Sequence, residues 1–169
     1  MRKILRGIDS VSGYSGRIGS WLCYALILVI VYDVTMRYVF TAPTMWAYET
    51  AIMLGGTIWA LNWAYTHSLR AHVRVDVIYS HRSLRKRAII DVVGTLFIFF
   101  PLLAVFISGS FSEMWQSWLV GEVSLESYWY PPLAPFRTIV LIGFCLLAFQ
   151  AVAQFIRDLY ILVKSKPYD

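Results

Sequence analysis

The sequence has little charge and few residues that could carry out chemistry. Only 15% of its 169 residues are charged and only two are cysteine, whereas 59% are hydrophobic. Soluble domains average about 25% charged residues, so this composition predicts an integral membrane protein. A chain of this length has room for one membrane domain, residues 1–169, and no second soluble domain. The formal charge of +5 fits basic loops beside anionic phospholipids, so no nucleic-acid partner is expected.

Residues for metal, haem and thiol chemistry are scarce as well. Cys23 and Cys145 stand alone in apolar runs, with no CxxC pair and no Cys/His cluster. The three histidines, His67, His72 and His81, fall outside the apolar runs. A four-helix haem protein needs histidines that project inward from its helices. Since a nucleophile-elbow pattern is also missing, the sequence predicts no cofactor, no metal site and no enzyme activity.

What the sequence does have is four long apolar segments, which we place at residues 18–40, 46–66, 88–112 and 133–163. About 20 apolar residues are needed to span a bilayer as a helix. Helices are expected because a lone strand would leave its backbone unpaired in lipid. The predicted fold class is therefore all-α, an integral membrane four-helix bundle. Pro101 in the third segment removes one backbone hydrogen bond and predicts a kink there.

Residues 1–15 are predicted to form a separate short element. Ile4, Leu5, Ile8 and Val11 recur at helical spacing among basic residues. This pattern is typical of an amphipathic helix that lies in the headgroup region. A frayed tail is the alternative.

The basic residues indicate the orientation of the chain. Thirteen of the fifteen Lys and Arg residues lie before the first span, in the loop 67–87 or after the uncharged stretch 138–156 of the fourth segment. Arg37 and Arg137 alone fall on the other side. Because cytoplasmic loops carry the excess of Lys and Arg, both termini are predicted to be cytoplasmic.

Charged residues at membrane depth are candidates for function. Asp33 and Arg37 stand four residues apart, on one face of a helix, and Glu49 follows after a turn that contains Pro43. We expect Arg37 to bridge Asp33 and Glu49 as a structural clasp of the first hairpin. Ion or proton coupling and a contact between subunits are the alternatives.

The second apolar segment carries a candidate subunit-packing face. Gly56, Ala60 and Ala64 recur at every fourth residue, and such stripes allow membrane helices to approach closely. Trp59 and Trp63 flank the stripe, although tryptophan prefers the membrane interfaces. Packing against protein explains these tryptophans better than lipid does. The spacing leaves open whether the neighbouring helix belongs to this chain or to another subunit.

Two further segments contain residue patterns that a lipid anchor or an aromatic belt would not by itself require. The basic loop is most simply an anchor to anionic lipid. Within it, His72, Arg74 and Asp76 alternate with valine. The segment before the fourth span is rich in aromatic and acidic residues. It fits an aromatic belt or a docking surface for a periplasmic partner, with the candidate residues Trp115, Trp118, Glu122, Glu126 and Trp129.

Taken in order, these motifs resemble the small membrane subunit of tripartite ATP-independent periplasmic (TRAP) transporters. The motifs that carry the resemblance are Asp33-x3-Arg37-Tyr38-Val39-Phe40, Trp46-x2-Glu49 and His72-Val73-Arg74-Val75-Asp76. The outer segment with Glu122-x-Ser124 and Pro131-Pro132 is similar to one branch of the family. One departure is Ala71, where family members often carry an acid.

The resemblance implies a role that the composition alone does not indicate. In such systems a large multispan subunit contains the sodium and substrate sites and works by an elevator motion in the bacterial inner membrane. A soluble periplasmic protein delivers the substrate, often an organic acid. The small subunit would brace the scaffold of the large one and help to receive the binding protein.

Two other functions remain open at this point. The chain could be an autonomous four-helix transporter that acts as a homodimer, with Glu49 as its proton-coupling acid. Its weakness is that a neighbouring Arg37 would keep Glu49 ionised. The chain could also be an anchor or assembly factor for an unrelated complex.

Overall fold

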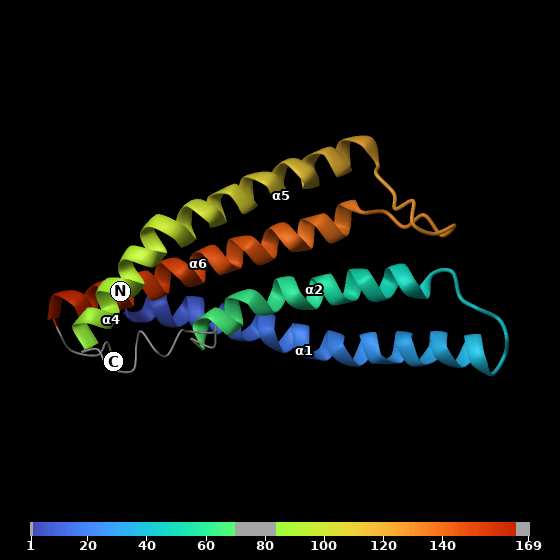
Figure 1. Ribbon diagram of the computed structural model, residues 1–169, viewed down its shortest axis with the longest axis horizontal. Helices are drawn as coiled ribbons and strands as arrows, with labels where there is room; N and C mark the ends of the chain where they lie inside the picture. The colour runs from blue at the N-terminus through green and yellow to red at the C-terminus, as the bar shows by residue number, and fades with distance from the viewer. Residues whose placement is uncertain (1, 70–83, 165–169) are drawn as a thin grey trace.

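The computed structural model describes residues 2–69 and 84–164, and most of these residues form long helices (Figure 1). The elements are α1 (Arg2–Tyr38), α2 (Ala47–Ser68), α4 (Leu84–Gly94), the π-helical turn η1 (Thr95–Phe99), α5 (Phe100–Val120) and α6 (Ala134–Lys164). The elements α4, η1 and α5 follow one another without a break, so they form one long rod. The predicted all-α class is confirmed for the described residues.

Three of these rods are long and apolar enough to cross a membrane. They are Lys3–Tyr38, Ile89–Val120 and Ala134–Val163. The helix α2 has sufficient length, at 22 residues, but polar side chains such as Glu49 and Asn62 reduce its hydropathy. Three of the four predicted membrane-spanning helices are therefore supported by length and composition. A membrane span at α2 stays a prediction.

The structure differs from the sequence-based expectation at the N-terminus. Residues 1–15 were expected to form a separate helix, whereas α1 continues from Arg2 to Tyr38. Serine hydroxyls within this stretch donate to carbonyls of the preceding turn, as in Ser10 Oγ to Arg6 O at 2.9 Å. Gly16 and Gly19 within the same helix lie against Tyr65 and Asn62 of α2. Whether the first turns lie among lipid headgroups stays a prediction.

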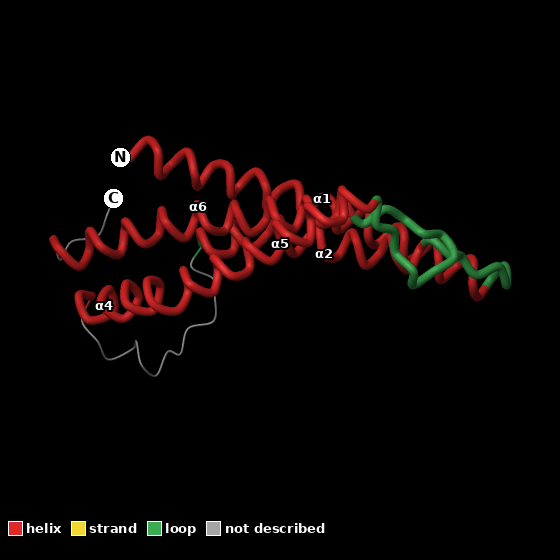
Figure 2. The backbone as a smooth tube through the Cα atoms, turned by 90° about the horizontal axis from the view of Figure 1, so that it is seen from above, coloured by secondary structure: helices red, strands yellow, loops and turns green. Residues whose placement is uncertain are grey.

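The helices stand in an open row and not in a closed bundle. The order across the row is α1, α2, α6 and α5, so that α2 packs on both α1 and α6, and α5 packs mainly on α6 (Figure 1). The view from above shows that α1 and α4 lie on opposite sides of α6 at the end near the termini (Figure 2). An open row leaves two broad helix faces without intramolecular cover.

A seam of small residues forms the core of this row. Among the described residues, six of the eight buried apolar side chains are alanines, and the other two are leucines. The seam lies where α2 meets α6, because a Cβ added at Gly143 would lie 2.7 Å from the carbonyl oxygen of Ala60. Backbones that approach this closely gain dispersion contacts along their whole length.

The predicted disturbance at Pro101 takes the form of a π-helical turn. The turn η1 occupies the five residues that precede α5, and Pro101 stands at the start of α5. Proline lacks the N–H that an α-helix would use, and a π turn re-arranges the bonding before it. The long rod changes direction at this point (Figure 1).

Candidate functional site

The first polar cluster lies where α1 ends and turns toward α2. Arg37 Nη2 lies 2.9 Å from Asp33 Oδ2, one helical turn away. The second carboxylate oxygen of Asp33 accepts a hydrogen bond from Thr44 Oγ1. Asp33 therefore connects the last turn of α1 to the segment that leads into α2. The rings of Tyr32 and Trp46, with centroids 5.7 Å apart, add an apolar contact across the same turn.

Glu49 does not join this cluster. Its side chain is buried, with 2% of the residue exposed, and neither carboxylate oxygen has a hydrogen-bond partner among the described residues. The expected bridge from Arg37 to Glu49 is therefore absent. The reason is local, because Thr44 occupies the position at Asp33 that faces α2, and Arg37 stays half exposed on α1.

The small-residue stripe of α2 packs within this chain. Ala60 and Ala64 are fully buried, and Gly143 of α6 abuts the backbone of Ala60. At Gly56 an added Cβ would lie 2.7 Å from the ring of Phe136, also on α6. Gly56 and Ala60 therefore contact α6, and Ala60 and Ala64 have no surface left for another subunit.

The two tryptophans of α2 have different surroundings. The ring of Trp63 packs on Phe144 of α6, with centroids 4.6 Å apart. Trp59 is 71% exposed in the middle of α2. Of the five residues expected on the packing face, Trp59 alone leaves a large apolar surface uncovered by this chain.

At the opposite end from the termini, one arginine ties the outer loop to two helices. Arg137 of α6 contacts Glu113 of α5 at 2.8 Å and Glu122 of the loop at 2.7 Å. Backbone bonds from Ser124 N to Pro131 O (2.9 Å) and from Leu133 N to Glu122 O (3.0 Å) close the loop into a hairpin-like shape. Glu122, one of the expected docking residues, is therefore engaged within the chain.

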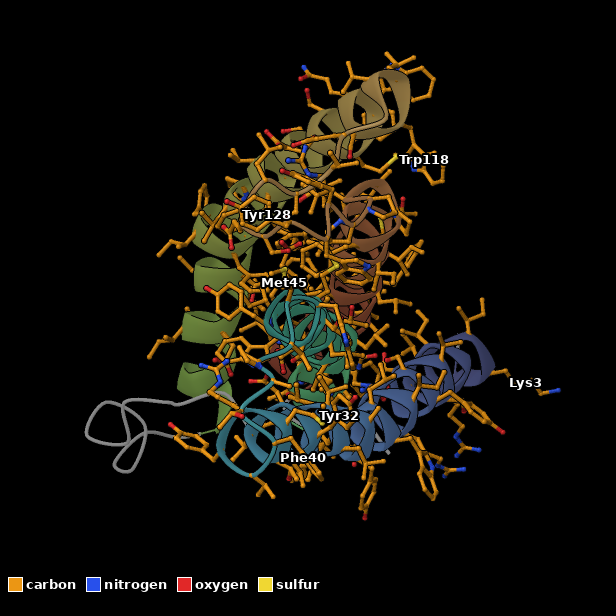
Figure 3. The ribbon with its side chains drawn as sticks, turned by 90° about the vertical axis from the view of Figure 1, so that its right-hand side faces the viewer. Lys3, Tyr32, Phe40, Met45, Trp118 and Tyr128 are labelled. Carbon is orange, nitrogen blue, oxygen red and sulfur yellow. The ribbon has the colours of Figure 1, made fainter. Side chains whose placement is uncertain are left out.

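The other expected docking residues lie on the surface. Trp115 and Trp118 belong to the last turns of α5, whereas Glu126 and Trp129 belong to the loop. Trp118 projects outward near the end of α5, whereas Tyr128 lies apart from it on the outer loop (Figure 3). Trp115 and Trp118 are each more than half exposed, although Trp118 Nε1 donates to Thr138 Oγ1 at 2.9 Å.

The loop motif His72, Arg74 and Asp76 lies outside the described residues. Its placement therefore stays a prediction. Within residues 2–69 and 84–164, no three His, Cys, Asp or Glu side chains are grouped as metal ligands would be.

A further polar network was missed by the sequence analysis. Gln150 of α6 accepts a hydrogen bond from Ser12 Oγ at 2.8 Å and donates to Asp9 Oδ1 at 2.9 Å. Arg157 of α6 pairs with the other oxygen of Asp9 at 2.5 Å. These partners are separated by more than a hundred residues, so no local spacing indicates that they meet. The network fastens the start of α1 to the second half of α6.

The described polar clusters connect one helix to another helix or to an adjoining loop. Such an arrangement can fix helices relative to each other.

Comparison with known proteins gives one match and one negative result. No curated protein is found to match the chain. The model of a protein family described as "Tripartite ATP-independent periplasmic transporters, DctQ component" matches residues 26–160. This segment includes the Asp33–Arg37 pair, α2, the outer loop and nearly all of α6. Because the match covers well over half of the chain, the protein belongs to the DctQ family and is the small membrane subunit of a TRAP transporter.

Proposed function

We propose that this small subunit braces the static scaffold of a large sodium-coupled elevator subunit in the bacterial inner membrane, with both of its own termini in the cytoplasm. The observation that carries the proposal is the open row of helices. The row is fastened internally by the alanine–glycine seam and by the Asp33 and Asp9 clusters, yet it leaves broad apolar faces uncovered. A rigid element with an uncovered face suits a scaffold that must stay still while its partner moves.

The α2 face of the row is the part that we assign to the large subunit. Tyr48, Ile52 and Trp59 lie along one side of α2 and are all exposed. Large aromatic side chains supply much of the binding energy at protein interfaces. A tryptophan at this depth gains more from a protein surface than from acyl chains, since in lipid it prefers the headgroup level.

Co-purification tests this assignment. The tagged chain and the large subunit are expressed together, extracted in mild detergent and quantified. Trp59→Leu is expected to lower recovery of the large subunit about tenfold, which corresponds to the loss of one interfacial aromatic anchor. The matched control is Trp21→Leu on α1, which is 69% exposed and is expected to leave recovery unchanged. Equal recovery with both variants would contradict the assigned face.

The outer end of the row supports a second part of the proposal, that the subunit helps to receive the periplasmic protein that delivers an organic acid. Trp115 stacks on Phe111 with centroids 6.3 Å apart, and both rings are more than half exposed. Removing both rings by Phe111→Ala and Trp115→Ala is expected to weaken capture of the binding protein by the assembled transporter. Unchanged capture in a titration with labelled binding protein would remove this part of the proposal.

One observation favours the alternative of an autonomous proton-coupled transporter. Glu49 is a buried carboxylate without a partner among the described residues, so the objection that Arg37 holds it ionised no longer applies. Liposomes that contain this chain alone should show no acid-driven uptake of organic acids if the scaffold proposal is correct. Uptake that disappears with Glu49→Gln would favour the autonomous transporter instead.

A further inference from the structure

A polar groove lies between the first half of α1 and the end of α2. It has a volume of about 490 Å³ and is lined by Ser10, Gly13, Tyr14, Gly16, Arg17, Ser20 and Tyr65. Glycine makes the groove possible, because a Cβ at Gly16 would lie 2.6 Å from the ring of Tyr65, and Gly13 leaves its floor open. None of the lining residues is acidic.

The groups that line this groove are suited to an anion. Ser10 and Ser20 already donate their hydroxyl protons to the carbonyls of Arg6 and Gly16. The remaining donors are the guanidinium of Arg17 and the phenol hydroxyls. Arg17 has no acidic partner among the described residues, and its guanidinium carbon lies 5.6 Å from the centre of the Tyr14 ring. A guanidinium that is held by an aromatic ring and free of carboxylates is well placed to bind a phosphate.

The position of Arg17 along α1 matches a membrane boundary. Arg17 and Arg37 are separated by 20 residues of continuous helix, which corresponds to about 30 Å. This is about the thickness of the hydrocarbon core. With Arg37 at one boundary, Arg17 therefore lies at the level of the phosphate groups on the other side.

An apolar track leads from the groove toward the middle of the membrane. Trp21, Tyr24 and Leu28 continue the side of α1 that carries Arg17, and each is more than 60% exposed. The rings of Trp21 and Tyr24 lie 5.5 Å apart. The surface therefore offers a cationic, donor-rich region followed by an apolar strip. This combination complements the headgroup and acyl chain of a phospholipid and not a soluble anion.

We infer that this groove binds one anionic phospholipid, with its phosphate on Arg17 and an acyl chain along Trp21 and Leu28. Basic pockets between membrane helices bind acidic headgroups in this way. The site needs only that α1 crosses the membrane, so it does not depend on the proposed bracing of the large subunit.

Native mass spectrometry of the full chain in detergent tests the inference. Phosphatidylglycerol and phosphatidylcholine with the same acyl chains are added in turn, and the bound copies are counted. The wild-type chain is expected to retain one phosphatidylglycerol preferentially. Arg17→Gln is expected to reduce that binding about tenfold, since a hydrogen bond to a charged group is lost. Lys3→Gln removes the same charge outside the groove and is expected to leave binding unchanged.

A second pair of variants blocks the groove without changing charge. An added Cβ meets nothing within 4 Å at Gly13 or at Gly7, so both positions accept a larger side chain. Gly13→Leu fills the groove and should abolish the preference for phosphatidylglycerol, whereas Gly7→Leu, outside the groove, should keep it. Equal loss with Arg17→Gln and Lys3→Gln, or unchanged binding with Gly13→Leu, would overturn the site. Displacement of the lipid by millimolar glycerol phosphate would show a soluble-anion site and overturn the lipid assignment.

Discussion

Glu49 is the residue whose surroundings differ most from those expected from its sequence motif. A buried carboxylate without hydrogen-bond partners is costly, and the described part of the chain supplies none. The i, i+4 spacing was sufficient to predict the Asp33–Arg37 pair. It could not predict that Thr44, within the turn, would take the remaining position on Asp33.

This cost gives a prediction for the isolated chain. Glu49→Gln removes the charge and keeps the shape, so it should raise the free energy of unfolding by about 1 kcal/mol, read as a higher Tm in detergent at neutral pH. Glu126→Gln, at an exposed loop position, is the control and should leave Tm unchanged. A lower Tm for Glu49→Gln would show that its carboxylate is satisfied within the chain.

Arg137 carries a second prediction at this scale. Arg137→Gln removes both ion pairs of the outer loop, and partly exposed pairs of this kind contribute about 1 kcal/mol. Hydrogen exchange at the amides of Ser124 and Leu133, which close the loop, is expected to accelerate about fivefold. Arg37→Gln, in the other turn, should leave those two amides unaffected. Protection that persists in Arg137→Gln would mean that the backbone bonds alone hold the loop.

Sequence separation explains why the pairings of Arg137 and of Asp9 were not predicted from the sequence. Arg137 and Glu122 face each other across a loop whose shape depends on the bridge between Val123 and Pro132. Asp9 and Arg157 meet because the start of α1 also contacts the second half of α6. Neither pairing follows a helical period, so no local rule could indicate it.

At the scale of elements, hydropathy and helical period predicted most of the described helices. One boundary differs, because residues 1–15, expected as a separate amphipathic helix, are continuous with the rest of α1. The stripe of Gly56, Ala60 and Ala64 predicted close packing, and the spacing left the partner open. The structure assigns that partner to α6, since Gly143 abuts Ala60.

One added methyl group tests how closely α2 and α6 pack in the seam. Gly143→Ala would place a Cβ 2.7 Å from the backbone oxygen of Ala60, and backbone cannot move aside as a side chain can. The expected loss is about 1–3 kcal/mol in the free energy of unfolding, measured by denaturant titration in detergent. Gly109→Ala, where an added Cβ meets nothing within 4 Å, is the matched control and should be neutral or slightly stabilising. Equal behaviour of the two variants would contradict the close approach of α2 and α6.

At the scale of the whole molecule, the row arrangement could not have been predicted from the sequence. Four apolar segments are as compatible with a closed bundle as with an open row. Hydropathy does not indicate which helix faces stay uncovered. Only the contacts show that α6, the last helix in the chain, lies between α2 and α5.

The orientation of the molecule gives a prediction at this scale. Because basic residues gather at the end with the termini, a green fluorescent protein fused after Asp169 should fluoresce in the cytoplasm. Alkaline phosphatase inserted at Ser127 in the outer loop should be active in the periplasm. Phosphatase activity of a fusion after Asp169 would reverse the assigned orientation.

The place of α6 between α2 and α5 also sets an order of events during biosynthesis. The hairpin of α1 and α2 can form as soon as both have left the ribosome. The rod of α4 and α5, however, enters the membrane before its main neighbour exists. It must wait at the insertion machinery or in lipid until the final helix slides between it and α2. The packing of the row is therefore complete only once α6 has been inserted.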